Sequence, residues 1–356
     1  MRPPHDGSAL MRALRISLPA RLAFVARLLL LLALPPVAVA QGQTLREVVF
    51  GEYGDYSSNP ELARRLLSPL TAARLERELA RSGRAVAAQP VNLAAERFIV
   101  YVPSQQPARG FALVVFVPPW QDARLPSGWA PVLERHGAIY VSAARAGNDE
   151  DVLGRREPLA LLAAHNIMKR YPVDPERIYV AGFSGGSRIA LRLALGYPDL
   201  FRGAMLNAGS DPIGDGQIPL PPKDLFLRFQ SSTQLAYVTG ERDAEHLAGD
   251  MASIHSLHKW CVVNVDDYVE PRIAHELADA TALDRALGSL GTAAQPHPDR
   301  LAACRSRIDF ELEENLQKLH SLIAAGRRAD ADKVLMRIDQ RFGGLAAPRI
   351  VGLATQ

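Results

Sequence analysis

Residues 177–193 read RIYVAGFSGGSRIALRL. The run IYVA is apolar and predicts a buried strand, whereas SRIALRL has the apolar spacing of a helix. Between them, Gly182-Phe-Ser184-Gly-Gly186 matches the pattern G-x-S-x-G. A strand-to-helix turn this tight strains the serine, and glycines keep Cβ atoms out of the crowded turn. Because the hydroxyl would stand at a helix N-terminus, where the dipole favours negative charge, we predict that Ser184 is a nucleophile. The alternative is a glycine-rich turn with a capping serine.

The same alternation of strand and helix extends on both sides of this turn. Apolar runs predict strands at 97–103, 111–117, 137–142, 177–181, 203–207, 234–238 and 261–265. Helical spacing occurs at 129–136, 158–171, 187–195, 244–259 and 276–290. Strands that alternate with helices indicate an α/β fold, with a mostly parallel sheet covered on both faces. We expect one such domain over residues 96–292.

A nucleophilic serine needs a histidine base, which a carboxylate orients. In this kind of fold the acid follows the serine along the chain, and the histidine follows the acid. Asp243 ends the strand-and-turn segment YVTGERD and is the expected acid, with Glu241 as second choice. Asp243 could equally cap the helix that follows it. His275 comes after the next predicted strand and is the expected base, whereas His246 lies on a predicted helix and is expected at the surface.

The expected oxyanion hole combines two backbone donors. The N–H of Gly185, directly after the nucleophile, is one of them. The loop after strand 111–117 begins Pro118-Pro119, and prolines cannot donate, so Trp120 or Gln121 must supply the second N–H. The chain has no zinc-ligand spacing, Walker loop or dinucleotide fingerprint, so we expect neither a metal nor a cofactor.

The first forty residues have the pattern of a signal peptide. A basic start leads to the apolar run 28–34, and Ala38-Val-Ala40 fits the cleavage site. This predicts export to the periplasm or the medium without a stable membrane anchor, although an uncleaved anchor is an alternative. The leader holds five arginines and one aspartate, so its removal takes the net charge from +3 to −1. That balance gives no reason to expect a nucleic-acid partner.

Two further segments flank the predicted domain. Residues 41–95 are expected to form an N-terminal helical extension, with a helix start at Asn59-Pro60. Residues 298–356 are expected to form a C-terminal helical hairpin and tail, because apolar residues recur every three or four positions. Cys304 lies on that apolar stripe. In an oxidising compartment we expect it to pair with Cys261, the alternative being two buried thiols.

The stretch YPVDPERIYVAGFSGG at 171–186, continued by YPDLF at 197–201, resembles exported esterases grouped with polyhydroxybutyrate depolymerases and feruloyl esterases. The resemblance covers about residues 97–290. It implies an α/β-hydrolase fold, a triad of Ser184, Asp243 and His275, no cofactor, and a small-molecule or polymeric ester as substrate. This chain has Pro118-Pro119 where the group usually has His-Gly.

Three functions are therefore expected in order. The first is hydrolysis of carboxylic esters by a serine-dependent enzyme. The second is a serine peptidase of the prolyl-oligopeptidase type, which shares fold and triad; residues 41–95 are too few for the large lid domain of those enzymes. The third is a non-catalytic binding protein on a hydrolase fold, with the hairpin as partner surface. The sequence names no protein partner.

Overall fold

The computed structural model describes residues 42–82, 87–292 and 298–353. The predicted signal peptide at 1–40 lies outside these residues. Within them, no helix has both the length and the apolar character needed to cross a membrane.

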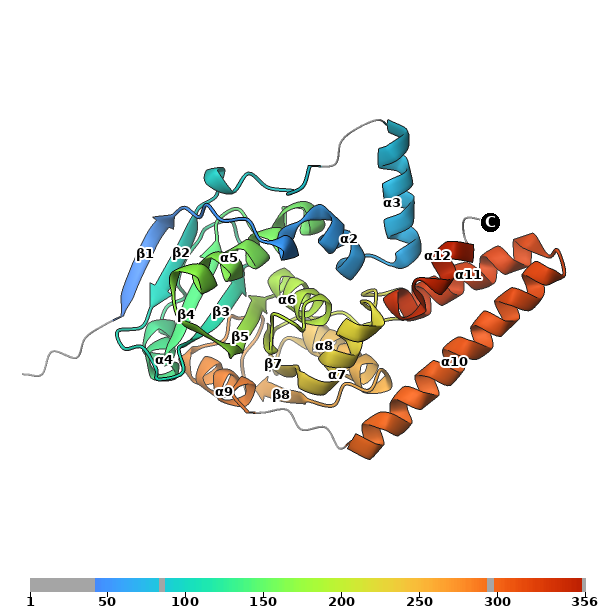
Figure 1. The fold of residues 1–356 in the computed structure, drawn as a ribbon. Helices are drawn as coiled ribbons and strands as arrows, with labels where there is room; N and C mark the ends of the chain where they lie inside the picture. The colour runs from blue at the N-terminus through green and yellow to red at the C-terminus, as the bar shows by residue number, and fades with distance from the viewer. Residues whose placement is uncertain (1–41, 83–86, 293–297, 354–356) are drawn as a thin grey trace, which may run out of the picture. The chain divides into compact units, whose positions relative to one another are not determined.

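One eight-stranded sheet organises the chain, in the order β1-β2-β4-β3-β5-β6-β7-β8 (Figure 1). β1 and β4 both pair antiparallel with β2, and every pairing from β4 to β8 is parallel. The strands are β1 (Gln43–Val48), β2 (Phe98–Val102), β3 (Phe111–Val117), β4 (Ala138–Ala143), β5 (Val173–Phe183), β6 (Gly203–Asn207), β7 (Gln234–Gly240) and β8 (Val265–Glu270). This is the α/β-hydrolase fold, as the sequence predicts.

Helices cover both faces of the sheet. The helices of the described residues are α2 (Asn59–Leu66), α3 (Pro69–Ser82), α4 (Trp129–His136), α5 (Glu157–Arg170), α6 (Gly185–Gly196), α7 (Lys223–Ser232), α8 (Ala244–Lys259), α9 (Ala280–Leu290), α10 (Pro298–Ala324), α11 (Arg328–Phe342) and α12 (Arg349–Leu353). Short helical turns lie at Asp55–Ser57, Leu93–Ala95, Val152–Arg156 and Gly343–Ala346.

The central strands are buried on both sides, which explains their unbroken apolar runs. Successive residues of β3 alternate between two cores: Leu113 and Val115 belong to one, Val114 and Phe116 to the other. Helices α4 and α9 close the second core, and α5, α6, α7 and α8 contribute to the first. Because strands β3 to β8 are parallel, their carboxyl ends lie at the same edge of the sheet, where the loops that follow can bring side chains together.

Two local predictions are wrong, and one helix was not predicted. Gln43–Val48, expected in a helical extension, is the edge strand β1, whose exposed face gives it no apolar run. Of the strand expected at 261–265, residues 261–264 instead form the exit from α8, where Cys261 has a left-handed φ of 66°. The true strand β8 starts at Val265 and alternates in burial because it lies at the other edge. Helix α7 was not expected at all.

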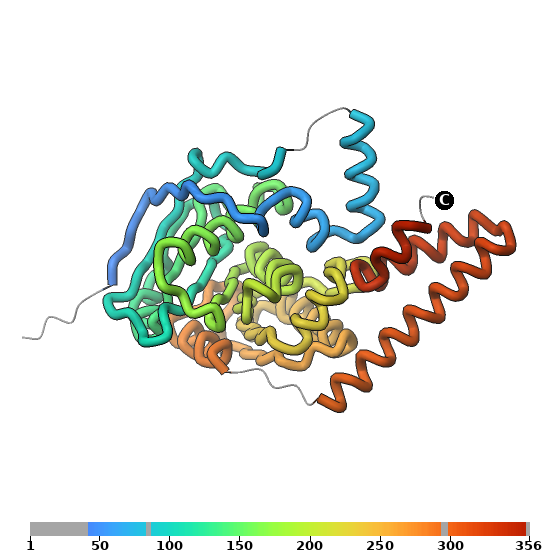
Figure 2. Tube along the Cα trace, viewed as in Figure 1, coloured from blue at the N-terminus to red at the C-terminus, as the bar shows by residue number. Residues whose placement is uncertain are grey.

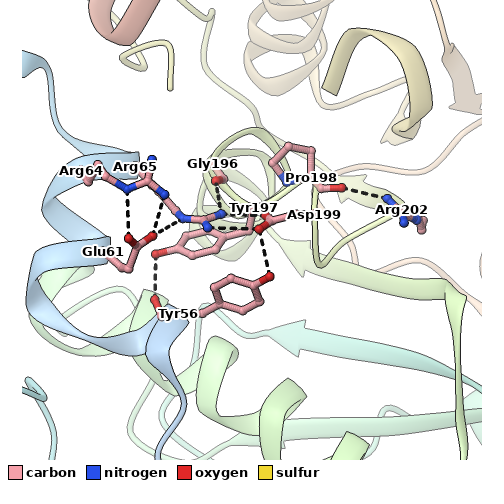
Figure 3. A network of polar contacts seen from close by, with 9 residues as sticks. All are labelled: Tyr56, Glu61, Arg64, Arg65, Gly196, Tyr197, Pro198, Asp199 and Arg202. Atoms are coloured by element: carbon pink, nitrogen blue, oxygen red, sulfur yellow. Dashed lines mark hydrogen bonds and ion pairs between the residues drawn. The ribbon is translucent and has the colours of Figure 1, made fainter. Parts of the chain in front are cut away.

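The N-terminal extension is attached to the hydrolase body by Arg65 of α2 (Figure 3). Its guanidinium donates to both carboxylate oxygens of Asp199, at 2.7 and 3.1 Å, and to Glu61 at 2.5 Å. The rings of Tyr56 and Tyr197 lie 4.8 and 4.7 Å from the same guanidinium. Arg65 is only 6% exposed, so this cluster is a buried ion pair with satisfied hydrogen bonds.

The C-terminal hairpin, α10 and α11, is tied to the hydrolase body at one end and to the N-terminal extension at the other. Cys261 and Cys304 form a disulfide between the exit of α8 and the first turns of α10. At the other end, Asp339 of α11 accepts hydrogen bonds from Ser68 Oγ at 2.6 Å and from the N–H of Leu70 at 3.0 Å. The tube in Figure 2 shows α3, α11 and α12 converging, in agreement with the contacts among these helices.

Replacing Asp199 with Asn is expected to lower the free energy of unfolding by about 2–3 kcal/mol, because it removes one of the two carboxylates that balance the buried guanidinium of Arg65. Burial raises the pKa of Asp199, but hydrogen bonds from Arg65 outweigh it and hold the pKa below its usual value. The stabilisation is therefore fully present at pH values above 3.8, the pKa of this carboxyl in the unfolded chain. It is lost as the pH falls through the lower pKa of the folded state. Denaturant unfolding from pH 7 to pH 3 measures this difference.

The matched control is Asp309→Asn, which removes an exposed ion pair with Lys223 and should cost under about 1 kcal/mol. Equal costs for the two variants, or a cost for Asp199→Asn that persists unchanged at pH 3, would contradict the role given to the cluster.

Removing the disulfide with Cys261→Ser and Cys304→Ser is expected to lower the unfolding free energy by about 2–4 kcal/mol, since the bond closes a 43-residue separation. Denaturant unfolding of the oxidised protein, the reduced protein and the double variant measures it. Reductant should change nothing in the double variant. An unchanged unfolding midpoint for reduced wild type would refute the expected contribution.

Candidate active site

Three loops at the carboxyl edge of the sheet bring the predicted catalytic residues together. Ser184 follows β5, Asp243 follows β7 and His275 follows β8. β5 is central, and β7 and β8 are its second and third neighbours on one side. The parallel arrangement thus places residues 91 positions apart in hydrogen-bond contact.

The turn at Ser184 has the strained backbone that the sequence predicts. Its φ is 55° and its ψ is −125°, in a region that favours glycine, and such a conformation costs about 1–3 kcal/mol. A Cβ atom on Gly182 would collide with the carbonyl of Gly186, and one on Gly186 with the carbonyl of Val117. The N–H of Ser184 donates to the carbonyl of Asn207 at 2.8 Å, which fixes the turn against β6.

A chain of hydrogen bonds runs from the serine to the carboxylate. His275 Nε2 lies 3.0 Å from Ser184 Oγ, and His275 Nδ1 lies 2.6 Å from Asp243 Oδ2. With Nδ1 donating to the carboxylate, Nε2 is left as the acceptor of the serine proton. The side chain of His275 is 37% exposed and that of Asp243 is 7% exposed, so solvent reaches the base but not the acid.

Asp243 is the N-cap residue of α8, yet its side chain makes no capping hydrogen bond. The carboxylate instead accepts from His275 and from His246, whose Nδ1 lies 2.8 Å from Oδ1. Burial raises the pKa of Asp243, but the hydrogen bonds from His246 and His275 outweigh it, so the pKa falls below the usual value. The carboxylate is therefore ionised at neutral pH. Glu241, the second choice for the acid, accepts from the N–H of Arg272.

His246 is placed beside these residues rather than at the open surface where it was expected. Its ring stacks on that of His275 with a centroid distance of 4.1 Å and an angle of 20°. Phe183 stacks on His275 at 4.9 Å and 29°. The signal for His246 was its position three residues after Asp243 at the start of a helix, a spacing that places both side chains on one face.

The loop after β3 holds the expected oxyanion residues. Trp120 packs against Phe116 and Phe183, with ring centroids 5.9 and 6.3 Å apart. The carbonyl of Gln121 accepts from the N–H of Arg145 at 2.6 Å. The donor roles of Gly185, Trp120 and Gln121 stay predictions.

Asn148 reaches the nucleophile turn from the loop after β4, which no sequence pattern indicated. A Cβ atom on Gly185 would collide with the side-chain oxygen of Asn148. The N–H of Asn148 donates to the carbonyl of Pro119 at 3.1 Å, so the loops after β3 and β4 are joined at this point. The side-chain amide of Asn148 is therefore a polar group directly beside Gly185.

Among the described residues, Asp243, His246 and His275 each offer an atom that could bind a metal ion, all within 4.8 Å of one another. Two imidazoles and a carboxylate suit a divalent transition metal by ligand type. Both Nδ1 atoms and both carboxylate oxygens are already engaged in the hydrogen bonds given above. A metal bound through these atoms would compete with the hydrogen bonds from His246 and His275 to Asp243.

No protein-family model matches the chain. The chain is 43% identical over 53 residues to NocK, a candidate esterase of Nocardia uniformis subsp. tsuyamanensis, which is 15% of this chain and 13% of that protein. Among solved structures it is similar to an acetyl xylan esterase from Aspergillus awamori, at 14% identity and a TM-score of 0.42, over 55% of this chain and 94% of that one. It is also similar to an S-formylglutathione hydrolase from Staphylococcus aureus, at 12% identity and a TM-score of 0.40, over 55% of this chain and 92% of that one. A hyperthermophilic esterase from Pyrobaculum calidifontis aligns at 17% identity and a TM-score of 0.41, over 61% of this chain and 87% of that one.

Proposed function

We propose that the protein is a serine hydrolase that cleaves carboxylic esters, with Ser184, His275 and Asp243 as its triad. The observation that carries the proposal is the continuous series of two short hydrogen bonds, Ser184 to His275 and His275 to Asp243. It is supported by the strained backbone at Ser184, which the fold would not need for a mere capping serine. The short match to NocK is consistent with this activity.

In the proposed reaction Ser184 Oγ attacks the ester carbonyl while its proton moves to His275 Nε2. The tetrahedral intermediate expels the alcohol, which takes that proton from the imidazolium and leaves an acyl ester on Ser184. Water then attacks the acyl group, with His275 again as the base, and releases the acid. Asp243 holds the imidazole in the required tautomer and stabilises its charged form, so it stays ionised throughout.

The negative charge that develops on the ester carbonyl oxygen must be stabilised by hydrogen-bond donors near Ser184. The N–H of Gly185 belongs to the first turn of α6, whose leading amides have no intrahelical acceptor. We assign it as one oxyanion donor, with the N–H of Trp120 or Gln121 as the other. The side-chain amide of Asn148 lies against Gly185 and is a further candidate for this charge.

The substrate class within esters, export by the predicted signal peptide, and membership of the polyhydroxybutyrate depolymerase and feruloyl esterase group stay predictions. The side chain of His275 is 37% exposed, so the base is open to solvent.

Ser184→Ala is expected to lower kcat for p-nitrophenyl esters, acetate through octanoate, by at least about 10³-fold, because the nucleophile is lost. The measurement is initial rates for wild type and variant of the chain from residue 41 onward. Equal rates in the two proteins would contradict the nucleophile. Turnover of peptide substrates alone would favour the peptidase.

Asp243→Asn is expected to lower kcat by about 10³–10⁴-fold, since an amide cannot stabilise the imidazolium and permits the wrong tautomer of His275. Glu241→Gln is the matched control, because Glu241 is bound to the loop backbone and should leave kcat within about threefold. The same ester assay compares them. A larger loss in the Glu241 variant would reverse the assignment of the acid.

A further inference from the structure

The carboxylate of Asp243 has two imidazole partners, whereas a serine triad requires only one. Oδ2 bonds to His275 at 2.6 Å and Oδ1 bonds to His246 at 2.8 Å. Because Asp243 is ionised and acts only as an acceptor, both rings must donate through Nδ1. The two imidazoles therefore have the same orientation toward one carboxylate.

His246 also confines the ring of His275. The two rings stack at 4.1 Å, and the ring of Phe183 also stacks on His275, at 4.9 Å. His275 thus packs against two aromatic rings while its Nδ1 is held by Asp243. An imidazole fixed in this way has little freedom to leave the line between Asp243 and Ser184.

The surroundings hold His246 in place. Gly209, with a φ of 127°, lies so close that a Cβ there would come within 2.8 Å of His246 Cδ2. Two titratable groups contact the ring, Asp243 from the loop after β7 and His275 from the loop after β8. Asp250, one turn further along α8, interacts with His246 electrostatically. Burial raises the pKa of Asp250 to about 6, in part offset by Thr239 and by His246.

We propose that His246 is a positioning residue for His275: it anchors Asp243 through its Nδ1–H, stacks on His275, and limits how much of the carboxylate's charge acts on His275. The physical reason is that a carboxylate that accepts two N–H donors is a weaker partner for each of them. Without the second donor, Asp243 would stabilise the imidazolium of His275 more strongly. The balance between neutral imidazole and imidazolium in His275 would then move toward the imidazolium. The catalytic part of this inference rests on the proposed function.

Two variants separate the donor from the ring. His246→Asn places a side-chain N–H near the position of Nδ1 but removes the stacked ring. His246→Phe keeps a ring against His275 but removes the donor. His246→Ala removes both without added bulk, and it replaces the Phe variant if the larger ring prevents folding, which thermal unfolding checks.

The first measurement is the NMR titration of the His275 ring nitrogens in a Ser184→Ala background, which needs no turnover. We expect the titration midpoint to rise by at least about half a pH unit in His246→Phe and His246→Ala, and to stay at the wild-type value in His246→Asn. The second is the pH profile of kcat/KM on p-nitrophenyl acetate in the Ser184 protein, whose acidic limb should move by the same amount.

Midpoints that are unchanged in the Phe and Ala variants would overturn the inference, as would equal shifts in the Asn and Phe variants. A shifted midpoint in a protein that hydrolyses no ester would refute the proposed function and leave the coupling of His246 to His275 intact. Ester hydrolysis with unshifted midpoints would refute only the role of His246.

Discussion

The site depends on the close approach of the turn at Ser184 to the backbone of its neighbours. Gly186 lies against the carbonyl of Val117 in β3, and Gly182 lies against the carbonyl of Gly186. Any side chain at either position would push α6 away from the sheet. Only with both glycines in place can β5 turn directly into α6 and present the hydroxyl of Ser184 at the helix N-terminus. His275 and Asp243 follow the ends of β8 and β7, and the parallel sheet already places these ends near Ser184.

Much of this could be predicted because it depends on local sequence. The glycine pattern, the apolar runs of β3 and β6, and the chain order of serine, acid and histidine led to the fold and to three residues that the structure brings together. The Cys261–Cys304 pair followed from two cysteines and a predicted export signal. Each inference used a short spacing, a rule of the fold or the expected compartment, and none requires knowledge of distant contacts.

What was missed depends on tertiary contacts. His246 lies on a helix whose bounds the sequence predicts, and only the packing of that helix against the loop after β8 reveals that its ring stacks on His275. Asn148 comes from a loop with no recognisable pattern and matters because that loop packs on the one after β3. β1 and β8 are edge strands, so they lack the continuous apolar runs that identify central strands. The segment 261–264 was misread because its apolar residues resemble a buried strand, whereas in the helix exit only Cys261 and Val262 are buried and Val263 is exposed.

The bond between Asp339 and the start of α3 joins residues about 270 positions apart. A ribosome makes the chain from its N-terminus, so α3 emerges long before its acceptor does. Until α11 has been made, Ser68 and the N–H of Leu70 can only be solvated, and the apolar face of α3 has no cover from α11 and α12. Helix α3 is therefore completed by α11 and α12, and assembly of this part of the protein must come late in folding.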